Sequence, residues 1–121
     1  MSRKVLVVED NPDNMKLVTW ILEDEHYDVT GVCTGEECLE QIQRDHYDVV
    51  LMDISLPGMD GKEATRRLRA MEQFRSMPII ALTAHAIKGE DEDIRASGVT
   101  DLITKPLDED QLLTRLRELI S

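Results

Sequence analysis

The stretch Asp48-Val49-Val50-Leu51-Met52-Asp53 decides the fold, because four consecutive apolar residues stand between two acids. A short block of aliphatic residues is typical of a strand that is buried on both faces of a parallel sheet. Turn-forming residues follow it in the segment Pro57-Gly58-Met59-Asp60-Gly61. We therefore predict that Asp53 lies at the carboxyl end of this strand, where open α/β sheets bind their ligands.

A second apolar run also ends in acid, since Lys4–Val8 is followed directly by Glu9 and Asp10. If the two strands are neighbours, three carboxylates converge on one edge of the sheet. Two carboxylates about 4 Å apart repel by up to roughly 4 kcal/mol at an effective dielectric constant near 20, so stability alone does not explain the cluster. Mg²⁺ takes one or two carboxylates and keeps waters and phosphate oxygens as its other ligands. The acids therefore predict a Mg²⁺ site.

Strand-like and helix-like segments alternate five times along the chain. This alternation indicates a parallel sheet with helices on both faces and right-handed crossovers. Because no glycine-rich dinucleotide fingerprint is present, we predict an α/β fold of the flavodoxin-like (βα)5 type, doubly wound, with the five-stranded order 2-1-3-4-5. In that order the first and third strands are adjacent. The predicted strands are Lys4–Val8, Tyr27–Val32, Asp48–Met52, Met77–Leu82 and Thr100–Thr104.

The segments between these strands have helical spacing of apolar residues. Asn11, Thr34 and Asp108 are each predicted to cap a helix, because a short polar side chain at that position accepts a bond from a free backbone N–H. A third helix is predicted over Gly61–Met71. Residues 87–97 predict a weakly amphipathic helix in an acidic stretch.

Composition limits the classes of function. The 121 residues suit one domain, 1–121, and 41% apolar with 3% aromatic residues predicts an aliphatic core. The net charge of −11 argues against nucleic-acid binding, which depends on Lys and Arg. With neither a secretory leader nor a membrane-length apolar stretch, we expect a cytoplasmic protein without a membrane anchor. Cys33 and Cys38 are interpreted as reduced packing residues.

Two further residues follow predicted strands and reach the same edge of the sheet. Thr83 comes directly after the fourth strand and Lys105 directly after the fifth. A lysine ammonium is a point charge suited to an anion. A carboxylate beside Mg²⁺ and a lysine, facing an incoming phosphoryl group, can act as a nucleophile and become an acyl phosphate.

Four separate motifs in this order resemble the receiver domain of two-component response regulators, over the whole chain. They are Val-Glu9-Asp10-Asn, Leu-Met-Asp53-Ile-Ser-Leu-Pro57-Gly-Met-Asp60-Gly61, Thr83-Ala84 and Lys105-Pro106. The resemblance implies that Asp53 accepts a phosphoryl group from a phosphohistidine. It also implies that Mg²⁺ binds Glu9, Asp10, Asp53 and the backbone carbonyl of Ser55.

The same resemblance assigns roles around the phosphoryl group. Thr83, Lys105 and the backbone amide of Ala84 are expected to contact its oxygens, and the Lys105–Pro106 peptide is expected to be cis. The positions of Ser55 and His85 tune how long the phosphoryl group lasts in such domains. Thr83 and Leu102 occupy the switch positions, and Leu102 departs from the aromatic residue that is usual there.

The predicted function is a stand-alone, monomeric phosphoacceptor that catalyses only its own phosphorylation and dephosphorylation. Its expected partners are a sensor histidine kinase or a histidine phosphotransfer protein, and a downstream protein target. The target is expected to bind the surface formed by the helix at 87–97, the fifth strand and the last helix.

Other interpretations remain open at this point. A Mg²⁺-dependent aspartyl-phosphate phosphohydrolase would have a second acid at the position of Ser55, and an inactive adaptor would have lost one of the acids. Taken singly, Asp53 could cap a loop and Glu9-Asp10 could be a solvated turn. The segment Gly58–Lys62 is too short between its glycines for a phosphate-binding loop and is interpreted as a turn that opens the third helix.

Overall fold

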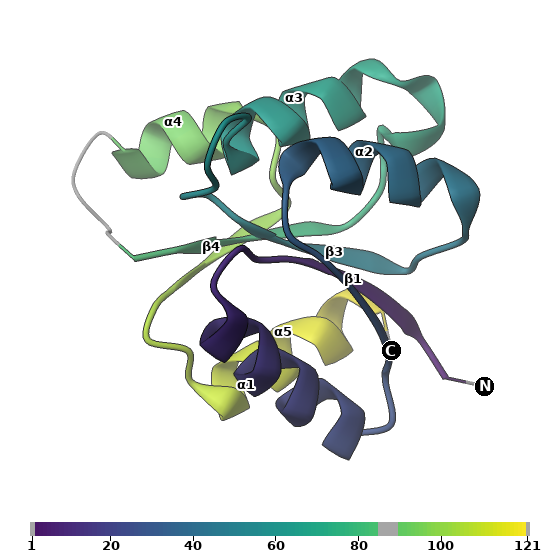
Figure 1. The fold of residues 1–121 in the computed structure, drawn as a ribbon, viewed down its shortest axis with the longest axis vertical. Helices are drawn as coiled ribbons and strands as arrows, with labels where there is room; N and C mark the ends of the chain where they lie inside the picture. Colours follow the sequence, from purple (N-terminus) through teal and green to yellow (C-terminus); the bar gives the residue numbers. More distant parts are fainter. Residues whose placement is uncertain (1, 85–89, 121) are drawn as a thin grey trace.

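The computed structural model describes residues 2–84 and 90–120. Five strands form one parallel sheet in the order β2-β1-β3-β4-β5, which confirms the predicted fold. Helices α2, α3 and α4 cover one face of the sheet, and α1 and α5 cover the other (Figure 1). The strands are β1 (Lys4–Val8), β2 (Asp28–Val32), β3 (Val49–Asp53), β4 (Ile79–Thr83) and β5 (Asp101–Thr104). The helices are α1 (Pro12–Asp24), α2 (Gly35–Arg44), α3 (Gly61–Ala70), the 3₁₀ turn η1 (Glu72–Phe74), α4 (Glu90–Ala96) and α5 (Glu109–Ile120).

Helix starts are fixed by the polar side chains that the sequence predicted. Asn11 accepts bonds from the backbone amides of Asp13 and Asn14 and caps α1. Thr34 caps α2 and Asp108 caps α5 in the same way. Each such cap stabilises a helix by about 1 kcal/mol. Asp60 caps α3, so the interpretation of residues 58–62 as a helix-opening turn is confirmed.

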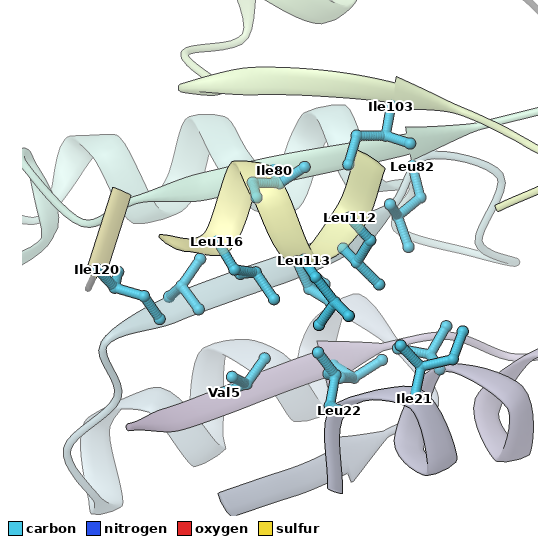
Figure 2. Packing of buried hydrophobic residues seen from close by; sticks show 14 residues of the cluster. Val5, Ile21, Leu22, Ile80, Leu82, Ile103, Leu112, Leu113, Leu116 and Ile120 are labelled. Carbon is cyan, nitrogen blue, oxygen red and sulfur yellow. The ribbon is translucent and has the colours of Figure 1, made fainter. Parts of the chain in front are cut away.

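Alternate residues along each central strand build two apolar layers, one on each face of the sheet. Val5 and Val7 of β1 face α1 and α5, whereas Leu6 and Val8 face α2 and α3. Figure 2 shows the first layer, in which side chains from the strands interdigitate with those of α1 and α5. Its labelled members are Val5, Ile21, Leu22, Ile80, Leu82, Ile103, Leu112, Leu113, Leu116 and Ile120.

Helix α4 rests on a much smaller apolar cluster. Its one buried large side chain, Ile94, packs against Ile54 and Ala81, with Val99 and Leu102 beside them. Burying one such side chain contributes about 1.5–3 kcal/mol. Within the part of the chain described, α4 is therefore the helix with the least apolar anchorage to the sheet.

The structure differs from the sequence predictions in several details. Asp53 and Thr83 are the last residues of β3 and β4, not the first residues after them. The turn η1 was not predicted, and residues 87–89 of the predicted fourth helix lie outside the described residues. Cys33 is exposed, so its interpretation as a packing residue is wrong. Cys38 is buried, and burial raises the pKa of its thiol to about 12.

Among the helices of residues 2–84 and 90–120, none combines the length and the apolar character needed to cross a membrane.

Candidate functional site

The site lies where four neighbouring strands end. Parallel pairing places Val8 of β1 opposite Met52 of β3, Asp53 opposite Leu82 of β4, and Thr83 opposite Thr104 of β5. Asp53 and Thr83 end their strands, and Glu9 and Lys105 directly follow theirs, so all four residues lie at the same edge of the sheet. This alignment brings together the carboxylates, the hydroxyl and the ammonium that the sequence singled out.

The carboxylates of Glu9, Asp10 and Asp53 form one cluster, each offering an oxygen within 4.8 Å of the others. Glu9 and Asp53 are buried, whereas Asp10 is exposed. Glu9 also accepts a bond from the backbone amide of Asn11 at 3.2 Å, which ties it to the start of α1. Burial, followed by the neighbouring Asp53, raises the pKa of Glu9 above its usual value. The direction of this shift shows that negative charge at Glu9 is disfavoured, so a cation beside the cluster would stabilise it.

Lys105 supplies the one cation that contacts this cluster in the described residues. Its Nζ lies 2.9 Å from Oε1 of Glu9 and 3.3 Å from Oδ2 of Asp53. Burial alone would lower the pKa of Lys105, but the bond to Glu9 and the charge of Asp53 outweigh it and hold the pKa above its usual value. Three carboxylates and one ammonium carry a formal charge of −2, which is the charge that one divalent cation offsets.

Backbone contacts fix the position of the Asp53 side chain and main chain. The Ser55 amide donates to Oδ1 of Asp53 at 3.0 Å. On the other side, the first residue of α3 is packed against the carbonyl of Asp53. A Cβ added to Gly61 would lie 2.2 Å from that carbonyl oxygen, so only glycine fits there.

Thr83 is buried beside this cluster, and its main chain is bonded to the main chain of Lys105. Its carbonyl accepts a bond from the Lys105 amide at 2.7 Å. Ala84 follows as an exposed residue, and His85 lies outside the described residues. Leu102 is half-buried and packs in the small cluster under α4, so it connects β5 to that helix.

The structure thus gathers Glu9, Asp10, Asp53, Thr83 and Lys105 at one edge of the sheet. The Lys105–Pro106 peptide is cis. The close approach of Gly61 was missed, because a glycine after Asp60 in a turn gives no sign of which atoms an added Cβ would contact. The geometry suits binding of a divalent cation and attack by a carboxylate on an electrophile such as a phosphoryl group.

Comparison with known proteins supports this chemistry. The family model for the response regulator receiver domain matches residues 5–117. The sensor protein GacS of Pseudomonas syringae pv. syringae is 46% identical over 112 residues, which are 90% of this chain and 12% of GacS. The chain therefore spans about an eighth of that relative's length. The polar-differentiation response regulator DivK of Brucella ovis is 41% identical over 107 residues, 88% of this chain and 87% of DivK.

Solved structures agree with the family model and with these relatives. The receiver domain of a sensor histidine kinase from Pseudomonas aeruginosa PAO1, with a magnesium ion coordinated in its active site cleft, has a TM-score of 0.93. It is 39% identical, and the match covers 99% of this chain and 98% of that one. Vibrio cholerae chemotaxis protein CheY4 has a TM-score of 0.92 at 29% identity, covering 98% of this chain and 99% of that one. From its motifs, its fold and its relatives, this chain belongs to the response regulator receiver domain family.

Proposed function

We propose that Asp53 accepts a phosphoryl group from a phosphohistidine, on a sensor histidine kinase or a histidine phosphotransfer protein, and that the acyl phosphate switches contacts with a downstream protein. The observation that carries this proposal is the buried carboxylate of Asp53 held between Lys105 at 3.3 Å and the acids Glu9 and Asp10. Two further acids beside a carboxylate repel it and lower the stability of the fold, so stability alone does not explain the cluster.

In the proposed step, a carboxylate oxygen of Asp53 attacks phosphorus. The oxygen–phosphorus bond forms as the phosphorus–nitrogen bond of the phosphohistidine breaks, and the released imidazole nitrogen takes up a proton. Lys105 stays beside the phosphoryl oxygens as a fixed positive charge. Mg²⁺ would be held by Glu9, Asp10, Asp53 and the carbonyl of Ser55, and when bound it offsets charge on the phosphoryl group.

The remaining site residues have supporting roles in this proposal. The hydroxyl of Thr83 and the amide of Ala84 donate to phosphoryl oxygens. Thr83 transmits the change to α4, whereas Leu102, at the other switch position, fills space beside that helix. Ser55 and His85 tune the lifetime of the acyl phosphate through their side chains. The output surface is formed by α4, β5 and α5.

The other classes of function fit the geometry less well. A phosphohydrolase needs a proton donor near the nucleophile, and Ser55, which takes the place of its second acid, is exposed and carries a hydroxyl. An adaptor without chemistry would not keep three acids and a lysine together. We further propose that the domain, residues 1–121, acts as a monomer in the cytoplasm and binds no nucleic acid, in keeping with its net charge of −11.

Incubation with acetyl phosphate and Mg²⁺, followed by mass spectrometry, tests the function directly. We expect one phosphoryl adduct, sensitive to hydroxylamine, on Asp53. Steady turnover of a small phosphate ester would instead support the phosphohydrolase, and absence of an adduct with every donor would support the adaptor.

The metal site predicts a stabilising effect of Mg²⁺. At a concentration about tenfold above its dissociation constant, the ion should stabilise the fold by about 1.4 kcal/mol and raise the melting temperature by about 5–6 °C. The Asp10→Ala variant should lose most of this rise, because it removes the exposed ligand of the cluster. Thermal unfolding with Mg²⁺ and with EDTA measures it, and identical wild-type curves would contradict the site.

Helix α1 presents a surface suited to the phosphohistidine donor. Leu17 and Trp20 are 43% and 68% exposed, the large apolar side chains most open to solvent among those described. They lie one turn apart on a helix that begins two residues after Asp10. Three exposed acids lie within about a turn of the pair along α1, against one exposed cation, Lys16, so a donor surface with apolar and basic side chains would complement it; these acids are Asp13, Glu23 and Asp24.

Replacing Trp20 with alanine should therefore slow phosphotransfer from a protein donor by about 10- to 30-fold, the effect of losing a buried aromatic contact at an interface. Labelling by acetyl phosphate should not change, because Trp20 lies outside the acid cluster. Gln43→Ala, an exposed position on α2 across the sheet, is the matched control. A Trp20→Ala protein with the wild-type transfer rate would exclude this docking surface.

The switch predicts different roles for Thr83 and Leu102. The Thr83→Ala variant should still accept phosphate but lose most of the phosphorylation-induced amide shifts in residues 84–97. The variant has no hydroxyl at position 83 to donate a hydrogen bond to the phosphoryl group. Leu102→Ala should mainly lower stability, by about 2–3 kcal/mol, since Leu102 packs against the small cluster under α4. NMR spectra of both variants before and after phosphorylation test these roles. Amide shifts of wild-type size in Thr83→Ala would refute signal transmission through Thr83.

A further inference from the structure

Arg69, in the last turn of α3, holds together segments that are distant in the sequence. Its Nε donates to the carbonyl of Gly98 at 2.8 Å, and Nη2 lies 3.3 Å from the hydroxyl of Thr100. Its Nη1 donates to the carbonyl of Phe74 at 2.7 Å. One guanidinium therefore joins α3, η1 and the connection between α4 and β5.

Arg69 differs from the other arginines of its helix. Arg66 and Arg67 are exposed and both pair with Glu63, at 3.1 and 2.9 Å. Arg69 is half-buried, makes no ion pair within residues 2–84 and 90–120, and directs its donors at two carbonyls and a hydroxyl. Burial lowers the pKa of its guanidinium. The planar guanidinium of Arg69 therefore fixes the relative positions of the segments it bonds, and it does not neutralise a nearby carboxylate among the described residues.

The carboxyl end of α4 is fixed further by the residues around Arg69. Gly98 has a φ of 110°, and a Cβ there would lie 2.8 Å from Cγ of Arg69, so the arginine stem packs directly on this turn. Thr100 exchanges backbone and hydroxyl bonds with Ile79, the first residue of β4, at 2.7 and 3.0 Å. This end of α4 is therefore tied to both α3 and β4.

Over the rest of α4, few apolar contacts to other described residues are made. Ile94 is its one buried large side chain, and its amino-terminal turn is formed by four acids, Glu90, Asp91, Glu92 and Asp93. That turn is the end of α4 nearer in sequence to Thr83 and the acid cluster. A helix tied firmly at one end and weakly along its length responds to a displacement of its other end by rotating about the fixed one.

We propose that Arg69 is a positioning residue that makes the turn at Gly98 a pivot, so that phosphorylation of Asp53 swings the acidic amino-terminal turn of α4 while Gly98–Thr100 stay in place. The inference rests on the proposed function, because it needs the phosphoryl group on Asp53 as the trigger. It adds the direction of the movement and the residue that sets it.

The test compares Arg69→Met, which keeps an unbranched apolar stem and removes the guanidinium, with the matched control Arg67→Met. Each protein is phosphorylated with acetyl phosphate and Mg²⁺, and amide shifts are recorded along α4. In the wild type and the control, shifts should be large at Glu90–Asp93 and at least fivefold smaller at 98–100. In Arg69→Met, the shifts at 98–100 should rise to those of Glu90–Asp93, with an unchanged yield of the Asp53 adduct.

A merely structural role would lower the melting temperature of Arg69→Met and keep the wild-type gradient, and that result would overturn the pivot. So would equal shifts at both ends of α4 in the wild type. If Arg69→Met does not fold, Thr100→Val decides instead, with Thr100→Ser as its control, since valine keeps the branched shape and loses the hydroxyl. A wild-type protein that forms no adduct would overturn the proposed function, whereas an adduct without the gradient overturns the pivot alone.

Discussion

Replacing Asp53 with asparagine is expected to abolish phosphorylation by acetyl phosphate and by a phosphohistidine donor. The amide has almost the same shape as the carboxylate but no anionic oxygen to attack phosphorus. Its oxygen can still accept the bond from the Ser55 amide that holds Asp53 at 3.0 Å. The variant should therefore fold normally, and its adduct yield should fall below about 1% of the wild-type yield, a loss of more than about 2.7 kcal/mol in the relative rate.

Asp101→Asn is the matched control for this substitution. Asp101 also lies on a strand and is bonded to a cation, with 2.8 Å between its Oδ2 and Nη1 of Arg115, but it lies outside the acid cluster. It should be labelled as fully as the wild type. Mass spectrometry of the intact proteins measures both yields, and wild-type labelling of Asp53→Asn would place the nucleophile at another residue.

Replacing Gly61 with alanine is expected to cause a large loss of stability, because Gly61 has the closest approach of any glycine that the structure describes. The new Cβ would lie 2.2 Å from the carbonyl oxygen of Asp53 and 2.9 Å from Cα of Ile54, which are backbone atoms and cannot rotate away. Relief requires α3 and β3 to separate, at a cost of about 3 kcal/mol. Without this contact, alanine in a first helical turn would stabilise by about 0.4–1 kcal/mol.

Gly31→Ala separates this effect from a general intolerance of glycine substitution. Its Cβ would lie 2.9 Å from Sδ of Met15, a flexible side chain that can move aside. Urea unfolding should show a small change for Gly31→Ala and a large one for Gly61→Ala. Because the same displacement moves the Asp53 backbone, Gly61→Ala should also lose most of its phosphorylation. A Gly61→Ala protein as stable as the wild type would contradict the close approach.

Much of the fold could be predicted because local signals and the global arrangement agree. The apolar runs of β1 and β3 are too short and too uniformly aliphatic for an amphipathic helix, and Asn11, Thr34 and Asp108 mark the helix starts. Strand alternation with helices then restricts the topology. Once β1 and β3 are neighbours, Glu9, Asp10 and Asp53 have to meet.

The rest depends on contacts between distant residues, which leave no pattern in the sequence. The spacing of Arg69 on α3 resembles that of its exposed neighbours Arg66 and Arg67, yet it alone reaches Gly98, 29 positions further along the chain. Leu17 and Trp20 fit the apolar periodicity of α1, but the sheet is already covered by other residues of that helix, so both remain exposed. The strands of Asp53 and Thr83 end one residue later than predicted, because pairing with the neighbouring strand extends them.

The position of the site on one edge of the sheet has a consequence for how such a chain can vary. The connection between α2 and β3 lies at the opposite edge, and its residues Asp45 and His46 are exposed and contribute nothing to the acid cluster. Exposed loop tips of this kind accept inserted residues with little loss of stability. A reporter peptide or a recognition sequence placed between Asp45 and His46 would break the bond from the His46 amide to Asp45, but is expected to leave the phosphoacceptor chemistry intact.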